Sequence, residues 1–246
     1  MRLACLALLA VLAGCGGSTK PTLTVSAATS LKSALTAYGR DFRGATVRAS
    51  FAGSDQLAAQ IRQGVKPDVF ASANTKLPDQ LYKQGLLEKP VVFAANRLVL
   101  AVPASGSKIT GVADLARPGT TIAMGAQAVP VGSYTRKVLS KLPATEAKAI
   151  LANVRSDEPD VGGVVGKVVQ GAVDAGFVYV TDVRAADGKL RAIDLPADLQ
   201  PQVAYGVAVV KGTHHAAQAR TFVDGLLHGA GRTRLDAAGF LPPPGT

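Results

Sequence analysis

Residues 25–35, VSAATSLKSAL, contain the strand–loop–helix pattern on which the rest of the chain is built. An apolar strand end at 23–25 leads into small residues at 26–29, and Ser30 then precedes apolar residues at helical spacing. The first N–H groups of a helix lack intrahelical partners and carry partial positive charge, which suits them to an anion. We therefore expect Ser30 at an N-cap position, donating to a bound oxyanion. The alternative is an ordinary N-cap serine.

The same alternation of strands and helices continues along the chain and predicts an α/β protein with mostly parallel sheets. Two long strands, near residues 97 and 207, are natural crossing points between two lobes with a cleft between them. The expected boundaries are residues 22–95 with 207–246 for lobe I, and residues 96–206 for lobe II. Weaker elements are a turn at 157–160 and a glycine-rich helix at 161–170, which tertiary contacts must hold.

Composition limits the classes of partner. The chain has 246 residues, of which 48% are hydrophobic, enough for one large domain or two smaller ones. It carries 27 Lys and Arg against 17 Asp and Glu, for a net charge of +10. The basic residues are scattered, only 5% of residues are aromatic and Trp is absent, which argues against nucleic-acid binding and favours a solvated basic surface.

The N-terminal segment predicts export and lipid attachment. Residues 3–13 form an apolar run too short to cross a bilayer, so residues 1–14 are expected to be a signal peptide. LAGC at 12–15 resembles the lipobox of bacterial lipoproteins, which implies cleavage before Cys15 and a lipid on its sulfur. Residues 15–21 would then be a tether, and the body would be extracytoplasmic at the bacterial cell membrane. The alternative is an ordinary signal peptide with an incidental cysteine.

Residues of the kinds that carry catalysis or bind bare metal cations show no favourable pattern. The three histidines all lie between residues 214 and 228, and no G-x-S-x-G motif is present. No Cys cluster or His pair has metal-ligand spacing. We expect neither an enzyme nor a bound cofactor.

Five short motifs, in order and in register, carry a resemblance to a known family. They are VSAATSL at 25–31, SFAGS at 50–54, DVFASA at 68–73, VPVG at 129–132 and GFVY at 176–179. Between about residues 22 and 241 the chain resembles the periplasmic molybdate-binding proteins of ABC importers. The resemblance implies a type II periplasmic-binding-protein fold, two α/β lobes that close by a hinge motion on a tetrahedral oxyanion, molybdate or tungstate. It also implies a monomer that delivers its ligand to a membrane permease and ATPase.

Carried over residue by residue, the resemblance implies a set of neutral donors. Ser30 and Ser54 would supply hydroxyl and backbone N–H groups from lobe I. Val131 and Val161 would supply backbone N–H groups from lobe II, and Tyr179 its phenol O–H. The four residues other than Tyr179 each lie at a predicted helix start, so four helix N-termini can face one anion without a Lys or Arg counter-charge.

Acidic neighbours and other ligands leave alternatives open. The alternative for Ser54 or Asp55 is a residue that only caps the helix at 56–63, and Asp160 is expected to cap the helix at 161–170. Because a carboxylate repels an anion, Asp55 and Asp160 must point away from such a site. The ligand could instead be sulfate or an organic anion, and the chain could be a ligand-sensing or adhesive lipoprotein without a transporter.

Overall fold

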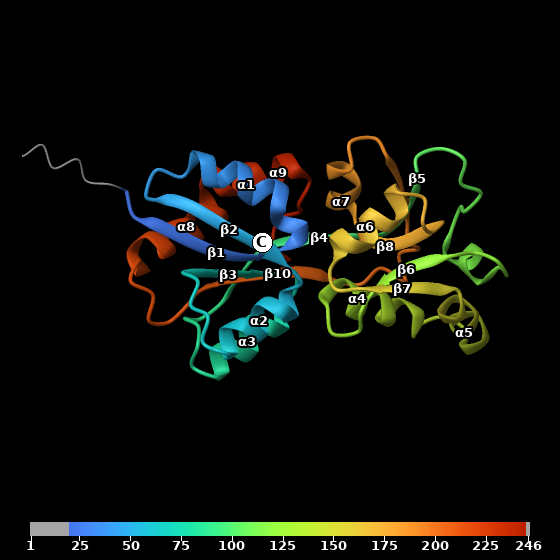
Figure 1. Ribbon diagram of the computed structural model, residues 1–246, viewed down its shortest axis with the longest axis horizontal. Helices are drawn as coiled ribbons and strands as arrows, with labels where there is room; N and C mark the ends of the chain where they lie inside the picture. The colour runs from blue at the N-terminus through green and yellow to red at the C-terminus, as the bar shows by residue number, and fades with distance from the viewer. Residues whose placement is uncertain (1–19, 245–246) are drawn as a thin grey trace, which may run out of the picture.

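The computed structural model describes residues 20–244 and consists of two α/β lobes. Figure 1 shows them side by side, with the blue N-terminal strands and the red C-terminal helices together in lobe I, and the green to orange segments in lobe II. The described residues do not include Cys15, the signal peptide or most of the expected tether, so those predictions lie outside the structure. In the described part of the chain, no helix is long and apolar enough to cross a membrane.

Lobe I is built on a five-stranded sheet in the order β2-β1-β3-β10-β4. Strands β1, β2 and β3 are parallel, while β10 runs antiparallel to both of its neighbours. The elements of this lobe are β1 (Thr22–Ala28), η1 (Thr29–Leu31), α1 (Lys32–Asp41), β2 (Thr46–Ala52), α2 (Ser54–Arg62), β3 (Val69–Ser72), α3 (Lys76–Lys83), β4 (Val91–Asn96), β10 (Val203–Val209), α8 (Ala216–His228) and α9 (Ala230–Ala238).

Lobe II repeats this plan in a second five-stranded sheet, ordered β7-β6-β8-β5-β9. Strands β6, β7 and β8 are parallel and β5 is the antiparallel member. Its elements are β5 (Leu98–Pro103), η2 (Val112–Ala116), β6 (Ile122–Gly125), α4 (Pro130–Leu139), α5 (Ala144–Ala152), β7 (Val154–Glu158), α6 (Val161–Val169), β8 (Ala175–Tyr179), α7 (Val180–Ala185) and β9 (Leu190–Asp194).

A matching hydrogen-bonded pair supports the likeness of the two lobes. The Asp68 carboxylate, just before β3, accepts from the backbone N–H and the hydroxyl of Thr24 in β1. The Asp174 carboxylate, just before β8, accepts in the same way from Thr121 next to β6. Each pair ties the starts of two neighbouring parallel strands, which sets their register and brings their carboxyl ends to the same edge.

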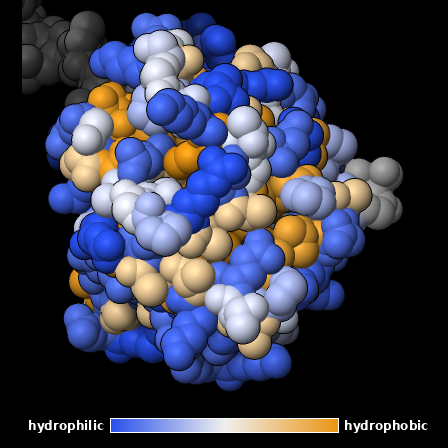
Figure 2. Space-filling view, turned by 90° about the vertical axis from the view of Figure 1, so that its right-hand side faces the viewer, coloured by the Kyte–Doolittle hydropathy of each residue, from blue (hydrophilic) through white to orange (hydrophobic). Residues whose placement is uncertain are grey.

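Packing follows the alternation expected of a sheet covered on both faces. In lobe I, Phe70 and Ala208 face the apolar layer under α2 and α3, whereas Val69 and Val207 face the core under α1, α8 and α9. Figure 2 looks onto the lobe II end, where hydrophilic side chains cover most of the face and smaller apolar patches lie between them.

The lobe boundaries differ from those expected. All of β10 pairs with lobe I strands, so residues 203–206 belong to the lobe I sheet. Asn96 is the last residue of β4 and belongs to the same sheet. The predicted limits of 96 and 207 were therefore wrong by one and four residues. The boundary was misplaced because the apolar alternation of a strand does not record which sheet its hydrogen bonds join.

Some local predictions were also wrong. Ser30 is not an N-cap: it is the middle residue of the short helix η1, and no side chain caps η1 or α1. Neither Ser54 nor Asp55 caps α2, whose N-cap residue is Gly53. The expected turn at 157–160 is half strand, since β7 runs to Glu158. Asp160 does cap α6, through a 3.0 Å bond from the Gly163 N–H, as predicted.

Candidate functional site

A cavity of about 20 Å³ lies between the two lobes. Pockets for drug-sized ligands measure about 300–1,000 Å³, whereas a single water needs about 10–15 Å³, so this space suits an ion of a few atoms. Its walls come from both lobes and comprise Ala28, Thr29, Ser30, Ala52, Gly53, Ser54, Ala73, Val129, Pro130, Val131, Asp160, Val161 and Tyr179. All five predicted site residues therefore meet at one cavity.

The lobes come into close contact beside this cavity. A Cβ atom on Gly53 of lobe I would lie 2.4 Å from the carbonyl oxygen of Pro159 in lobe II. A Cβ atom on Gly162 of lobe II would lie 2.8 Å from the Thr29 methyl group. Both distances are shorter than any carbon side chain tolerates, so glycine at these positions allows the lobes to approach this closely.

The two serines of lobe I present hydroxyl groups at the carboxyl ends of parallel strands. Ser54 is the first residue of α2, and its Oγ accepts a 3.1 Å hydrogen bond from the Ala73 backbone N–H. Its own hydrogen is therefore left for another acceptor. The Ser30 Oγ lies 3.0 Å from the Tyr205 hydroxyl. Both serines are buried, at 8% exposed for Ser30 and 0% for Ser54.

Lobe II contributes two helix starts. Val131 follows Pro130, the first residue of α4, and Val161 is the first residue of α6. N–H groups at these positions precede the first intrahelical hydrogen bond and point out of the helix end. The valine side chains are buried in the core and have no donor, so only their backbone N–H groups can donate to an anion.

Tyr179 closes the cavity from the end of β8. Its hydroxyl is buried and has no hydrogen-bond partner within residues 20–244. Burial, and then the neighbouring Tyr205 and Tyr134, raise the pKa of Tyr179 well above its usual value, so the phenol keeps its proton. A buried unpaired hydroxyl is costly and calls for an acceptor. An anion in the cavity would supply one.

The charge around the cavity is unusual for an anion site. None of its described lining residues is Lys, Arg or His. Asp160 is part of the wall, although we expected it to point away; its Oδ1 is occupied by the cap of α6. Asp55 does not line the cavity, and its Oδ1 is buried without a hydrogen-bond partner in the described part of the chain. Any attraction for an anion must come from helix starts and aimed hydrogen bonds rather than from a counter-charge.

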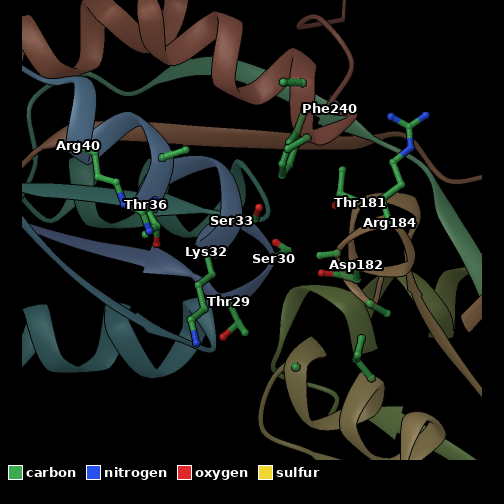
Figure 3. Close-up of a pocket in the computed structure, with 17 residues that line it drawn as sticks. Thr29, Ser30, Lys32, Ser33, Thr36, Arg40, Thr181, Asp182, Arg184 and Phe240 are labelled. Atoms are coloured by element: carbon green, nitrogen blue, oxygen red, sulfur yellow. The ribbon is translucent and has the colours of Figure 1, made fainter. Parts of the chain in front are cut away.

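A wider groove of about 790 Å³ adjoins the cavity and shares Thr29 and Ser30 with it. In Figure 3, Lys32 and Arg40 extend from the lobe I side, and Asp182 and Arg184 from the lobe II side. Burial raises the pKa of Asp182 to about 7. The hydrogen bond that its carboxylate accepts from the Tyr179 N–H at 2.9 Å has a smaller, opposite effect on this pKa. The groove thus combines exposed basic side chains with one buried, easily protonated carboxyl group.

Sequence analysis missed three residues beside the site: Asn96, Thr181 and Tyr205. They are polar groups at most 4% exposed, bonded to one another and to Ser30. Each lies in or next to an apolar strand, which the sequence pattern assigns to the core. Only their convergence in space distinguishes them. Among residues 20–244, no group of three or more His, Cys, Asp and Glu side chains lies close enough to hold a metal cation.

Two lobes joined by two crossings, with an ion-sized cavity between them, are the architecture of a solute-binding protein. The family model described as "Bacterial extracellular solute-binding protein" matches residues 23–241, and the chain belongs to this family.

Individual relatives agree with this family. The chain is 40% identical over 228 residues to "Molybdate-binding protein ModA" of Mycobacterium tuberculosis, covering 90% of this chain and 85% of the relative. It is 33% identical over 219 residues to "Putative ABC transporter substrate-binding lipoprotein YvgL" of Bacillus subtilis, covering 84% and 81%. Among solved structures, the Azotobacter vinelandii periplasmic molybdate-binding protein superposes with a TM-score of 0.80 at 26% identity, covering 90% of this chain and 99% of that one.

Proposed function

We propose that this chain captures molybdate, and also tungstate, outside the cytoplasm and delivers it to an ABC importer. The observation that carries the proposal is the cavity of about 20 Å³ between the lobes, which Ser30, Ser54, Val131, Val161 and Tyr179 all line. The names of the relatives support molybdate as the ligand, since a protein 40% identical over most of its length is called molybdate-binding.

In the proposed mechanism the open lobes admit the anion and close on it by a hinge motion. Ser30 and Ser54 would donate from lobe I, and the N–H groups of Val131 and Val161 with the Tyr179 hydroxyl from lobe II. Hydrogen bonds to a charged acceptor contribute about 1.5–3 kcal/mol each, so several in a dry site can hold a small dianion. Neutral donors favour a fully deprotonated anion, because a protonated one needs an acceptor that these groups do not offer.

Parallel calorimetric titrations with molybdate, tungstate and sulfate test the ligand. Saturable binding of molybdate and tungstate, with sulfate at least tenfold weaker, is the expected result. If sulfate bound more tightly than molybdate, the ligand would be sulfate, and the chain would still be an oxyanion receptor. No heat and no competition with any of the three would contradict the proposal.

Membrane attachment and partners belong to the same proposal. We infer cleavage before Cys15, a lipid on its sulfur and docking on a permease with its ATPase, with the binding protein acting as a monomer and not as an enzyme. A relative named as a lipoprotein supports the anchor. Labelling of growing cells with a palmitate analogue should mark the native chain but not Cys15→Ser, and the variant should be recovered in the soluble extracytoplasmic fraction.

A further inference from the structure

A chain of buried hydrogen bonds connects Ser30 at the cavity with lobe II. The Ser30 Oγ lies 3.0 Å from the Tyr205 hydroxyl, which lies 3.4 Å from the Asn96 Nδ2. The same Nδ2 donates to the Thr181 Oγ1 at 2.8 Å. Asn96 is the last residue of β4 in lobe I, and Thr181 is in the first turn of α7 in lobe II, so this chain crosses from one lobe to the other.

The orientation of the Asn96 amide group is determined by a separate contact. Its Oδ1 accepts a 2.9 Å hydrogen bond from the Arg97 backbone N–H. A backbone N–H can only donate, so the oxygen of the amide must face it, and the NH₂ group must face Thr181 and Tyr205. Asn96 therefore presents hydrogens to both hydroxyl groups and cannot accept from either.

This orientation determines the direction of the remaining hydrogen bonds. Tyr205 has a single hydroxyl hydrogen, and burial raises its pKa well above the usual value, so it keeps this hydrogen. Pointing it at Asn96 would place two hydrogens face to face, so it goes to the Ser30 Oγ instead. Ser30 then accepts from Tyr205, and its own hydrogen is left for the cavity.

We propose that Tyr205 and Asn96 are positioning residues for the anion site: they hold the Ser30 hydroxyl so that it donates into the cavity. Neither needs to touch the anion, and neither is among the residues that line the cavity. The Ala73 backbone N–H acts on Ser54 in the same way, because it donates to the Ser54 Oγ and leaves the hydroxyl hydrogen for another acceptor. The inference rests on the proposed oxyanion-binding function, because the direction of the Ser30 hydroxyl matters only if it meets an acceptor.

A double-mutant cycle with Ser30 tests the inference, with molybdate as the probe and calorimetry as the readout. Tyr205→Phe should weaken molybdate binding about 3- to 10-fold, the worth of one hydrogen bond. In a Ser30→Ala background the same change should weaken binding less than about twofold, because no hydroxyl remains to be oriented. An equal loss in both backgrounds would mean that Tyr205 acts on the fold in general, and would overturn the inference.

Matched variants separate positioning from loss of structure. Tyr38→Phe removes another buried phenol, which donates to the Phe222 carbonyl oxygen far from the cavity, and should leave affinity unchanged. Thr181→Val removes the acceptor of one Asn96 hydrogen and should weaken binding, whereas Thr181→Ser keeps the acceptor and should restore it. If Tyr205→Phe does not fold, the Thr181 pair still decides: equal affinities for Val and Ser would overturn the inference.

The outcome for the unaltered protein separates this inference from the proposed function. If the unaltered protein binds molybdate and Ser30→Ala weakens binding while Tyr205→Phe does not, the positioning role is wrong and the function stands. If the unaltered protein binds no tetrahedral oxyanion, both are wrong.

Discussion

At the residue scale, the proposed site depends on buried hydroxyl groups, two of which already have a hydrogen-bond partner. Ser54 accepts from the Ala73 N–H, and the hydroxyl of Ser30 is in contact with that of Tyr205. Tyr179 has a buried hydroxyl without any partner in residues 20–244. Ser30, Ser54 and Tyr179 thus bring hydroxyl groups to the cavity, as does Thr29, whose Oγ1 is also buried without a partner in residues 20–244. None of the described lining residues carries a positive charge.

Removing either serine hydroxyl should weaken anion binding. A hydrogen bond to a charged acceptor contributes about 1.5–3 kcal/mol, so Ser30→Ala and Ser54→Ala should each reduce molybdate affinity roughly 10- to 150-fold. Ser54→Ala should also lower the free energy of unfolding by about 1–3 kcal/mol, because it leaves the Ala73 N–H buried and unpaired. Titration calorimetry and urea unfolding measure the two effects. Unchanged affinity in both variants would contradict the assignment of these serines.

Asp182 should make stability depend on pH. Its pKa is raised to about 7 by burial, while an unfolded Asp titrates near 3.9, so between these values the folded protein binds the extra proton. The free energy of unfolding should therefore fall as pH rises from about 4 to 7. Asp182→Asn keeps an acceptor for the Tyr179 N–H but removes the titration. Urea unfolding at several pH values should show a smaller fall in the free energy of unfolding for the variant than for the native chain. Equal falls in the two proteins would contradict the assignment of this pH dependence to Asp182.

At the element scale, α6 shows why a sequence poor in helix propensity can still form a helix at the site. It contains Gly162, Gly163 and Gly166, each costing about 1 kcal/mol against alanine. A Cβ on Gly162 would press on Thr29, and one on Gly163 would lie 2.4 Å from the Glu158 carboxylate. At these two positions glycine lets the start of α6 reach the other lobe and its own preceding strand.

Removing the cap of α6 should destabilise lobe II. Asp160→Ala should lower the free energy of unfolding by about 1 kcal/mol, because the Gly163 N–H loses its partner. Asp160→Asn retains a capping oxygen and should be nearly neutral in stability. It also removes a negative charge from the cavity wall, so it should bind molybdate more tightly than the native chain. Weaker binding by this variant would show that the carboxylate does not oppose the anion.

At the scale of the whole molecule, function depends on how closely the lobes approach. The two crossings are joined where the Gln200 side chain exchanges hydrogen bonds with the backbone N–H and carbonyl of Leu98. Beyond this joint the lobes meet at Gly53 and Gly162. The size of the cavity therefore depends on how closely the two lobes approach, and not on either lobe alone.

Adding one methyl group at the lobe contact should hold the lobes apart. Gly53→Ala places a Cβ against the Pro159 carbonyl oxygen, so closure over the anion should be incomplete and molybdate affinity should fall at least tenfold. Gly111→Ala is the matched control, since its Cβ would meet no atom of residues 20–244 within 4 Å. Small-angle X-ray scattering with saturating molybdate should show a more extended Gly53→Ala. Equal affinity and equal dimensions would contradict this account of closure.

Ligand binding should stabilise the whole chain. An anion that binds only the folded protein adds about 2.7 kcal/mol at 100 times its dissociation constant. For a chain of this size that raises the melting temperature by roughly 5–10 °C. Thermal unfolding with molybdate, and with chloride at matched ionic strength, measures the shift. Identical melting temperatures would argue against binding.

Local patterns in the sequence predicted much of the fold. Apolar periodicity and small-residue loops indicate the alternating strands and helices, because they depend on neighbours within a few positions. The Asp160 cap and the helix from Val161 were predicted on this basis. Ser30 as an N-cap was wrong, because the chain forms a short tight helix before α1, and that choice depends on packing against β10 and lobe II.

The sequence by itself determined the type of fold, the order of its elements and, through the family resemblance, which five residues meet at the cavity. Only the tertiary structure decided which sheet β10 joins, how closely the lobes approach and which residues contact the site hydroxyl groups. These depend on contacts between residues far apart in the chain, such as Ser30 with Tyr205 and Asn96 with Thr181. Residues 25–35 supply the serine, and in the proposed network Tyr205 and Asn96 orient it.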